Sequence, residues 1–315
     1  MTTRHTRAYL VTLALWTAYA ALNFLTPTTE NNALGLSPVS LALIRVSIVV
    51  PYLLAWLAGT YGALTLFDAA KSMPEKEDRS AFRQIAMGIL ILLGGVIVTS
   101  FVSGIRSYMM PSGRDVSSFV IVINYLYVFV PLAGFFYIFN GAGRLRGAPG
   151  TELSAAWAIC GTALLLLFSA LYVWLIFTNP TRQTSSDPKI APSYFLPDAA
   201  IVLTIVIPFL ATCVLALLAI LRLLRYYRGV TGFLYKRSSL HLMYGLLGVI
   251  TGSLLLQALL SLGSGRLLGL GLGPLLLVIY VFLIVQTLGY VFVALGARKL
   301  AAVERVMAKY EKPAS

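Results

Sequence analysis

The residue whose setting points most directly to chemistry is an arginine inside an apolar run. Arg45 lies in a stretch that stays apolar from about residue 39 to residue 66, and a charge inside a membrane segment marks a candidate functional position. It stands about two helical turns from Pro38, roughly 10 Å at 1.5 Å per residue, so its guanidinium can reach the membrane surface. Two interpretations stay open: an ion pair with Glu30 or Asp198, or contact with an anionic ligand or lipid.

Uncharged polar side chains within the apolar runs form a second candidate set. The paired carboxylates and histidine relays of an ion-coupled pump are missing from these runs. The polar positions could instead line a pathway for a neutral solute, or form hydrogen bonds between neighbouring helices. They are Asn23, Ser47, Asn124, Tyr125, Gln257 and Gln286.

The other reactive residue types form no catalytic, metal or cofactor site. The histidines, His5 and His241, are both predicted on the cytoplasmic side, which argues against a haem held between facing ligands within the membrane. Cys160 and Cys213 have no histidine or carboxylate at metal-ligand spacing. No acid, base and nucleophile occur together near either membrane surface, so the sequence favours a non-catalytic protein over a membrane enzyme acting on lipids, and it predicts no metal and no cofactor.

The elements that must position these residues are long apolar helices. The chain has 315 residues, of which 59% are hydrophobic and only 11% charged, a balance far more apolar than that of soluble domains. A membrane span needs roughly 20 apolar residues. The sequence therefore predicts an all-α membrane protein with about eight transmembrane helices, at residues 8–26, 39–66, 84–105, 118–140, 154–177, 199–224, 240–262 and 274–296.

The basic residues predict how the chain is oriented. The formal net charge is +13, and most Lys and Arg residues fall in alternate connections between the predicted spans. Because Lys and Arg accumulate in cytoplasmic loops, both termini are predicted inside, in a plasma membrane. The predicted partner is the lipid bilayer, with anionic headgroups at the cytoplasmic face; no nucleic-acid-binding motif is present. Whether a protein partner or a second copy joins it is left open.

The spans resemble one another in two sets of four. The sequence around Pro51 parallels that around Pro208 at an offset of 157 positions, and Gly134 pairs with Gly289 at an offset of 155. We therefore predict two four-helix repeats, at residues 1–147 and 148–300, followed by a short cytoplasmic tail at 301–315. An even number of spans per repeat gives both repeats the same orientation. Pro51 and Pro208 are predicted to bend their helices at equivalent depths.

Two functional hypotheses follow from this architecture. The parallel duplication and the matched prolines favour a transporter or channel-like protein for a neutral or amphipathic small molecule. The short loops and the scarcity of polar residues within the spans favour the alternative, a non-catalytic membrane subunit or scaffold of a larger complex.

Overall fold

The chain folds into a bundle of long α-helices. A computed structural model describes residues 3–25, 38–109, 117–145, 207–230, 232–261 and 272–310, and within these ranges it contains helices and no strand. The seven described helices are α1 (Thr3–Leu25), α2 (Pro38–Ser72), α3 (Lys76–Met109), α4 (Ser117–Gly143), α7 (Ile207–Gly229), α8 (Phe233–Ser261) and α9 (Leu272–Tyr310).

Four of these helices contain a segment that is long and apolar enough to cross a membrane. These segments are Val49–Ser72, Lys76–Val98, Ile207–Gly229 and Ile279–Met307, and they are compatible with an integral membrane protein. The predicted spans at 8–26, 118–140 and 240–262 correspond in position to helices α1, α4 and α8. The predicted span at 154–177 lies outside the described residues.

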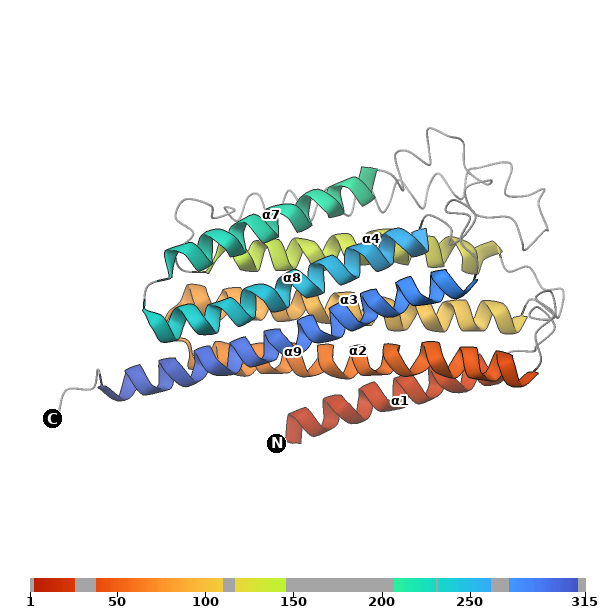
Figure 1. Cartoon of the computed structure of the whole chain (residues 1–315), viewed down its shortest axis with the longest axis horizontal. Coiled ribbons are helices and arrows are strands. Elements are labelled where there is room, and N and C mark those ends of the chain that lie inside the picture. Colours follow the sequence, from red (N-terminus) through yellow and green to blue (C-terminus); the bar gives the residue numbers. More distant parts are fainter. Residues whose placement is uncertain are drawn as a thin grey trace.

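The described helices lie side by side, with their long axes running along the length of the molecule (Figure 1). Helix α8 packs on α9 and α3 packs on α4, and these pairs are joined because α2 contacts both α3 and α9 while α7 contacts α4 and α8. Helix α1 contacts α2 and α3. The shared core contains large side chains with almost no exposed surface, including Trp56, Phe82, Phe135 and Tyr290.

Glycines allow α3 and α4 to approach closely. A Cβ atom added at Gly88 would lie 2.6 Å from the carbonyl oxygen of Gly134, and one added at Gly141 would lie 3.0 Å from the backbone nitrogen of Ile85. Both distances are too short for a methyl group beside backbone atoms. The two helices therefore meet backbone to backbone, as small residues permit in membrane bundles.

Helices α8 and α9 make the same contacts at corresponding positions. A Cβ added at Gly245 would lie 2.8 Å from the carbonyl oxygen of Gly289, and one added at Gly296 would lie 2.5 Å from the backbone nitrogen of Leu242. Gly245 and Leu242 follow their α3 counterparts by 157 positions, whereas Gly289 and Gly296 follow their α4 counterparts by 155. The two helix pairs thus share one packing pattern.

Several helices run beyond the apolar segments predicted from the sequence. The stretches at 71–83 and 225–239, interpreted from the sequence as long loops, are largely helical, because α3 begins at Lys76 and α8 begins at Phe233. Glu77 and Asp78 favour the first turn of α3 by complementing its dipole. Helix α9 continues through the predicted tail as far as Tyr310.

Candidate functional site at the basic end

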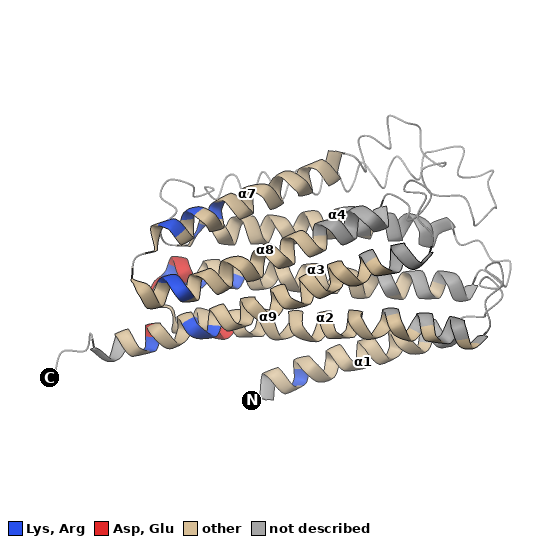
Figure 2. Cartoon of the chain, in the orientation of Figure 1, with Lys and Arg blue, Asp and Glu red and all other residues tan. Residues whose placement is uncertain are grey.

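Charged residues gather toward one end of the described bundle (Figure 2). We call this the basic end; there α2, α4, α7 and α9 finish and α1, α3 and α8 begin. The carbonyl ends of helices carry partial negative charge, so cations in their last turns are favoured. Lys71 and Arg228 occupy such positions in α2 and α7. Helix dipoles therefore favour the positive charge at this end.

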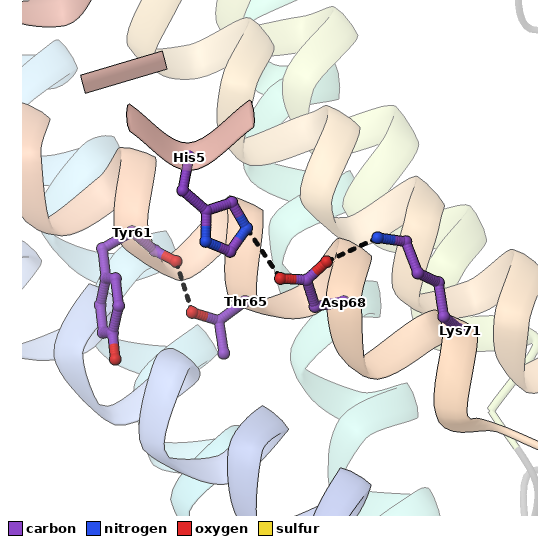
Figure 3. A network of polar contacts seen from close by, with 5 residues as sticks. All are labelled: His5, Tyr61, Thr65, Asp68 and Lys71. Atoms are coloured by element: carbon purple, nitrogen blue, oxygen red, sulfur yellow. Dashed lines mark hydrogen bonds and ion pairs between the residues drawn. The ribbon is translucent and has the colours of Figure 1, made fainter. Parts of the chain in front are cut away.

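A carboxylate at the basic end joins α1 to α2 (Figure 3). One oxygen of Asp68 lies 2.7 Å from Nε2 of His5, and the other accepts a 2.7 Å hydrogen bond from Nζ of Lys71. The Asp68 side chain keeps 39% of its surface exposed, whereas that of His5 keeps 20%. His5 lies in α1, just before the predicted span at 8–26, and its contact with Asp68 joins the first turns of that helix to α2.

Two further polar contacts hold α1 along α2. The Thr12 hydroxyl donates to the carbonyl of Ala8 at 2.9 Å, and its oxygen also lies 3.4 Å from the Thr60 hydroxyl. Because the Thr12 proton is already used, Thr60 acts as the donor between them. The Trp16 indole nitrogen donates to the carbonyl of Val49 at 3.4 Å. Helix α1 is thus attached through spaced polar contacts.

Helix α9 is joined to the basic ends of α2 and α8. Arg298 donates a 2.7 Å hydrogen bond to the Tyr61 hydroxyl, and the Lys299 ammonium lies 3.1 Å from Nε2 of His241. Nδ1 of His241 lies 2.7 Å from the carbonyl oxygen of Arg237. A carbonyl only accepts and an ammonium only donates. Nδ1 of His241 is therefore the donor to the Arg237 carbonyl, and Nε2 faces the Lys299 ammonium.

An arginine of α7 lies against α4. The Arg222 guanidinium carbon is 3.6 Å from the centre of the Phe139 ring, and the same side chain donates a 3.1 Å hydrogen bond to the Phe139 carbonyl. A guanidinium over an aromatic face gains cation–π attraction while keeping its other donors free. The contact of Arg222 with Phe139 was not predicted from the sequence, because the neighbour of Arg222 on α4 follows from the fold.

The predicted polar positions with described side chains form contacts between helices. Ser47 accepts a 2.5 Å hydrogen bond from the Tyr280 hydroxyl, which links α2 to α9. The Gln286 amide donates to the Ser253 hydroxyl at 2.9 Å and to the Tyr290 hydroxyl at 3.1 Å, which links α9 to α8. Tyr280 and Tyr290 were not among the predicted site residues; the partner of Tyr280 lies 233 positions away in the sequence, whereas Tyr290 follows its partner Gln286 by four.

Other predicted positions lie outside the described part of the chain. Glu30 and Asp198 fall in undescribed segments, so their pairing with Arg45 stays a prediction. Pro51 lies inside α2, and Pro208 is the second described residue of α7. Helix α4 contains a proline of its own, Pro131, that was not singled out. The side chains of four further predicted positions, and that of Arg45, are also undescribed: Asn23, Asn124, Tyr125 and Gln257.

The polar side chains described above join neighbouring helices. Across the described ranges, no group of three or more His, Cys, Asp or Glu residues could hold a metal ion. The described part of the chain is helical, with four segments long and apolar enough to cross a membrane, which is compatible with a membrane protein. Comparison with known proteins finds no match to the chain among family models, curated proteins or solved structures.

Proposed function

We propose that the chain is a multi-pass membrane protein built from two four-helix repeats in the same orientation, with both termini on the cytoplasmic side. The matching glycine contacts support the duplication: Gly88 meets Gly134 as Gly245 meets Gly289. The basic end supports the orientation, because it contains both the start of α1 and the end of α9, and basic residues accumulate on the cytoplasmic side.

Within that architecture, we propose that the protein acts as a non-catalytic membrane subunit whose bundle is a scaffold. The observation that carries this proposal is the close contact between α2 and α9. A Cβ added at Gly62 would lie 3.1 Å from the carbonyl oxygen of Tyr290, and one added at Gly59 would lie 3.1 Å from the ring of Tyr290. These contacts leave little space where the two proposed repeats meet.

The side chains beside this contact are buried, although the buried indole nitrogen of Trp56 has no hydrogen-bond partner among the described residues. Tyr290 has no exposed surface and its hydroxyl accepts from Gln286, and Trp56 on α2 is 2% exposed. A solute pathway requires polar groups that face water. Here the polar groups of α8 and α9 bond to each other, which is how polar side chains hold membrane helices together.

A test that needs no known activity is the reaction of introduced cysteines with a membrane-impermeant maleimide. Ser253→Cys is nearly isosteric and places a thiol in the Gln286 contact; Arg225→Cys places one at the exposed basic end. Both are made in a background with Cys160→Ala and Cys213→Ala, and the protein is reconstituted in liposomes. We expect Arg225→Cys to be modified and Ser253→Cys to stay unmodified until the protein is denatured.

Modification of Ser253→Cys in the native protein would contradict a closed bundle. It would favour the second candidate function, transport of a neutral or amphipathic small molecule. The observation behind that candidate is the same cluster of Gln286, Ser253 and Tyr290, which brings three polar side chains together between α8 and α9. A pathway should also make the modification sensitive to the solute that it carries.

The scaffold proposal also predicts a partner chain. Extraction of the protein from its native membrane with surrounding lipid, followed by native mass spectrometry, should give a particle of fixed stoichiometry that contains a further chain or a second copy. Recovery of single chains alone at every extraction condition would contradict the subunit role, even if the bundle is closed.

A further inference from the structure

The connection between α7 and α8 carries positive charge that its own helices do not neutralise. Residues 222–237, which we call the α7–α8 turn, contain no acid, and none occurs anywhere between Asp198 and Glu304. The residues at 68–83, the α2–α3 turn, instead contain four cations and four acids. The basic residues of the α7–α8 turn are Arg222, Arg225, Arg228, Lys236 and Arg237.

The cations of the α7–α8 turn lie on the ends of two helices that a short connection joins. Arg222, Arg225 and Arg228 recur at every third position, so they lie on neighbouring turns of α7. Arg225 and Arg228 are exposed, whereas Arg222 is half-buried against α4. Lys236, at the start of α8, lies 5.6 Å from the centre of the Tyr227 ring on α7. Like charges are thus concentrated at the joined ends of α7 and α8.

Apolar side chains are exposed beside these cations. Phe233 keeps 77% and Leu234 keeps 63% of its surface accessible, although both are large and apolar. They follow Gly232, whose φ of 90° gives the connection a conformation that residues with a Cβ rarely adopt. Large apolar side chains next to cations are the features by which a surface inserts at the boundary between lipid headgroups and acyl chains.

Acids from other elements lie near the buried side of α7. Asp78 of α3 and Glu304 of α9 lie within electrostatic range of the Tyr226 hydroxyl, and that side chain is buried and bonded to Ser239 of α8. Arg228 follows Tyr226 by two positions, about 200° around the helix, and therefore lies on roughly the opposite side of α7. The carboxylate of Asp68, which contacts His5 and Lys71, belongs to the α2–α3 turn.

We propose that the α7–α8 turn is a binding site for the headgroup of an anionic phospholipid, with Phe233 and Leu234 inserted among the acyl chains. The phosphate lies between the guanidinium groups of α7 and the cations that begin α8, where arginine offers paired donors to its oxygens. The turn closes a hairpin in which α7 is apolar enough to cross the bilayer, so the cations stand at headgroup depth. This inference does not depend on the scaffold role.

The test is lipid selectivity of the purified full-length protein, measured by native mass spectrometry. Equal amounts of phosphatidylglycerol and phosphatidylcholine with the same acyl chains are added, and bound lipids are counted at low salt and at 0.5 M NaCl. One variant replaces Arg225, Arg228, Lys236 and Arg237 by Gln. The matched control replaces four exposed cations of the α2–α3 turn by Gln: Lys71, Lys76, Arg79 and Arg83.

We expect the native chain to prefer phosphatidylglycerol and to lose much of that preference in high salt. Each cation near a membrane surface contributes a factor of about five in lipid binding. The α7–α8 variant should therefore lose nearly all selectivity, while the control keeps it despite the same change in net charge. Phe233→Ser should weaken retention of both lipids, and inorganic phosphate at millimolar concentration should not displace the bound lipid.

Equal losses in the two variants would mean that net charge alone sets the preference, and would overturn the proposal. So would a native chain with no preference, or displacement by inorganic phosphate, which would indicate a site for the free anion. If the fourfold variant fails to fold, the pair Arg228→Gln and Arg237→Gln is compared with Lys76→Gln and Arg83→Gln by the same measurement, with the same two outcomes.

Discussion

The α2–α3 turn and the α7–α8 turn occupy corresponding places in the two helix sets, but they manage charge differently. In the first, Asp68 binds both Lys71 and His5, and the Arg79 side chain donates to the carbonyl of Pro74 at 2.8 Å. In the second, the cations have no acid in their own helices, and Phe233 is largely exposed. The first turn satisfies its charges within the protein, whereas the second presents them outward.

The packing of the helix pairs and the charge of the turns that join them are separable in this fold. The glycines that bring α3 onto α4 recur where α8 packs on α9, so both turns close helix pairs of the same geometry. What differs is the set of side chains that the turn presents, together with the presence of α1 beside α2 and α3. Substitutions can therefore test the common packing and the differing charge one at a time.

The largest effect is expected where the two helix pairs are alike. Gly245→Ala places a methyl group 2.4 Å from the backbone nitrogen of Val293, and Gly88→Ala places one 2.6 Å from the carbonyl of Gly134. Neither backbone can yield without separating its helices, so each variant should lose about 1–3 kcal/mol or more of unfolding free energy. The measurement is a denaturing-detergent titration of each purified variant.

Gly94→Ala is the matched control for this prediction. It lies in α3, close to Gly88 in the sequence, but nothing lies within 4 Å of its added Cβ. Alanine is favoured over glycine in a helix by about 1 kcal/mol, so this variant should be unchanged or more stable. A loss of unfolding free energy in only one of Gly245→Ala and Gly88→Ala would show that the two helix pairs are not packed alike.

The sequence predicts the elements better than their ends. Apolar runs located each described helix, because lipid-soluble helices need continuous apolar surface. Apolar runs did not predict the helical residues within 71–83 and 225–239, because charged residues lower the hydropathy there while the backbone stays helical. Glu77 and Asp78 favour a helix start, and Lys236 and Arg237 are tolerated in the first turn of α8. Hydropathy identifies segments that are apolar enough for the lipid interior, and a helix can continue beyond the end of such a segment.

The candidate site was predictable as a region but not as a set of contacts. Counting Lys and Arg predicted a basic end, since charge bias is a property of the chain alone. The bond from Tyr280 to Ser47 joins residues 233 positions apart, and the contact of Arg222 with Phe139 requires α7 to lie on α4. Such pairs depend on helix neighbours, which apolar periodicity does not specify.

An intermediate effect is expected from the backbone of the α7–α8 turn. Gly232→Ala forces a residue with a Cβ to adopt a φ of 90°, while the nearest atom to the new methyl group, in Tyr235, is 3.8 Å away. The cost is conformational rather than steric, about 1–2 kcal/mol. Gly229→Ala, at the helical end of α7, is the control and should be tolerated. Both are measured by the same titration; equal behaviour would show that the turn does not require its glycine.

The smallest effect on stability should come from removing an acid that compensates the cations of the α2–α3 turn. Asp68→Asn removes both ion pairs, but because the carboxylate is 39% exposed, the loss should stay below about 1 kcal/mol. The local effect is larger, since the contact with His5 holds the first turns of α1 on α2. We expect faster hydrogen exchange at the start of α1 in Asp68→Asn, and no change in Glu77→Gln, which removes an exposed acid from the same turn. Unchanged exchange in both variants would mean that Thr12 and Trp16 hold α1 without the carboxylate.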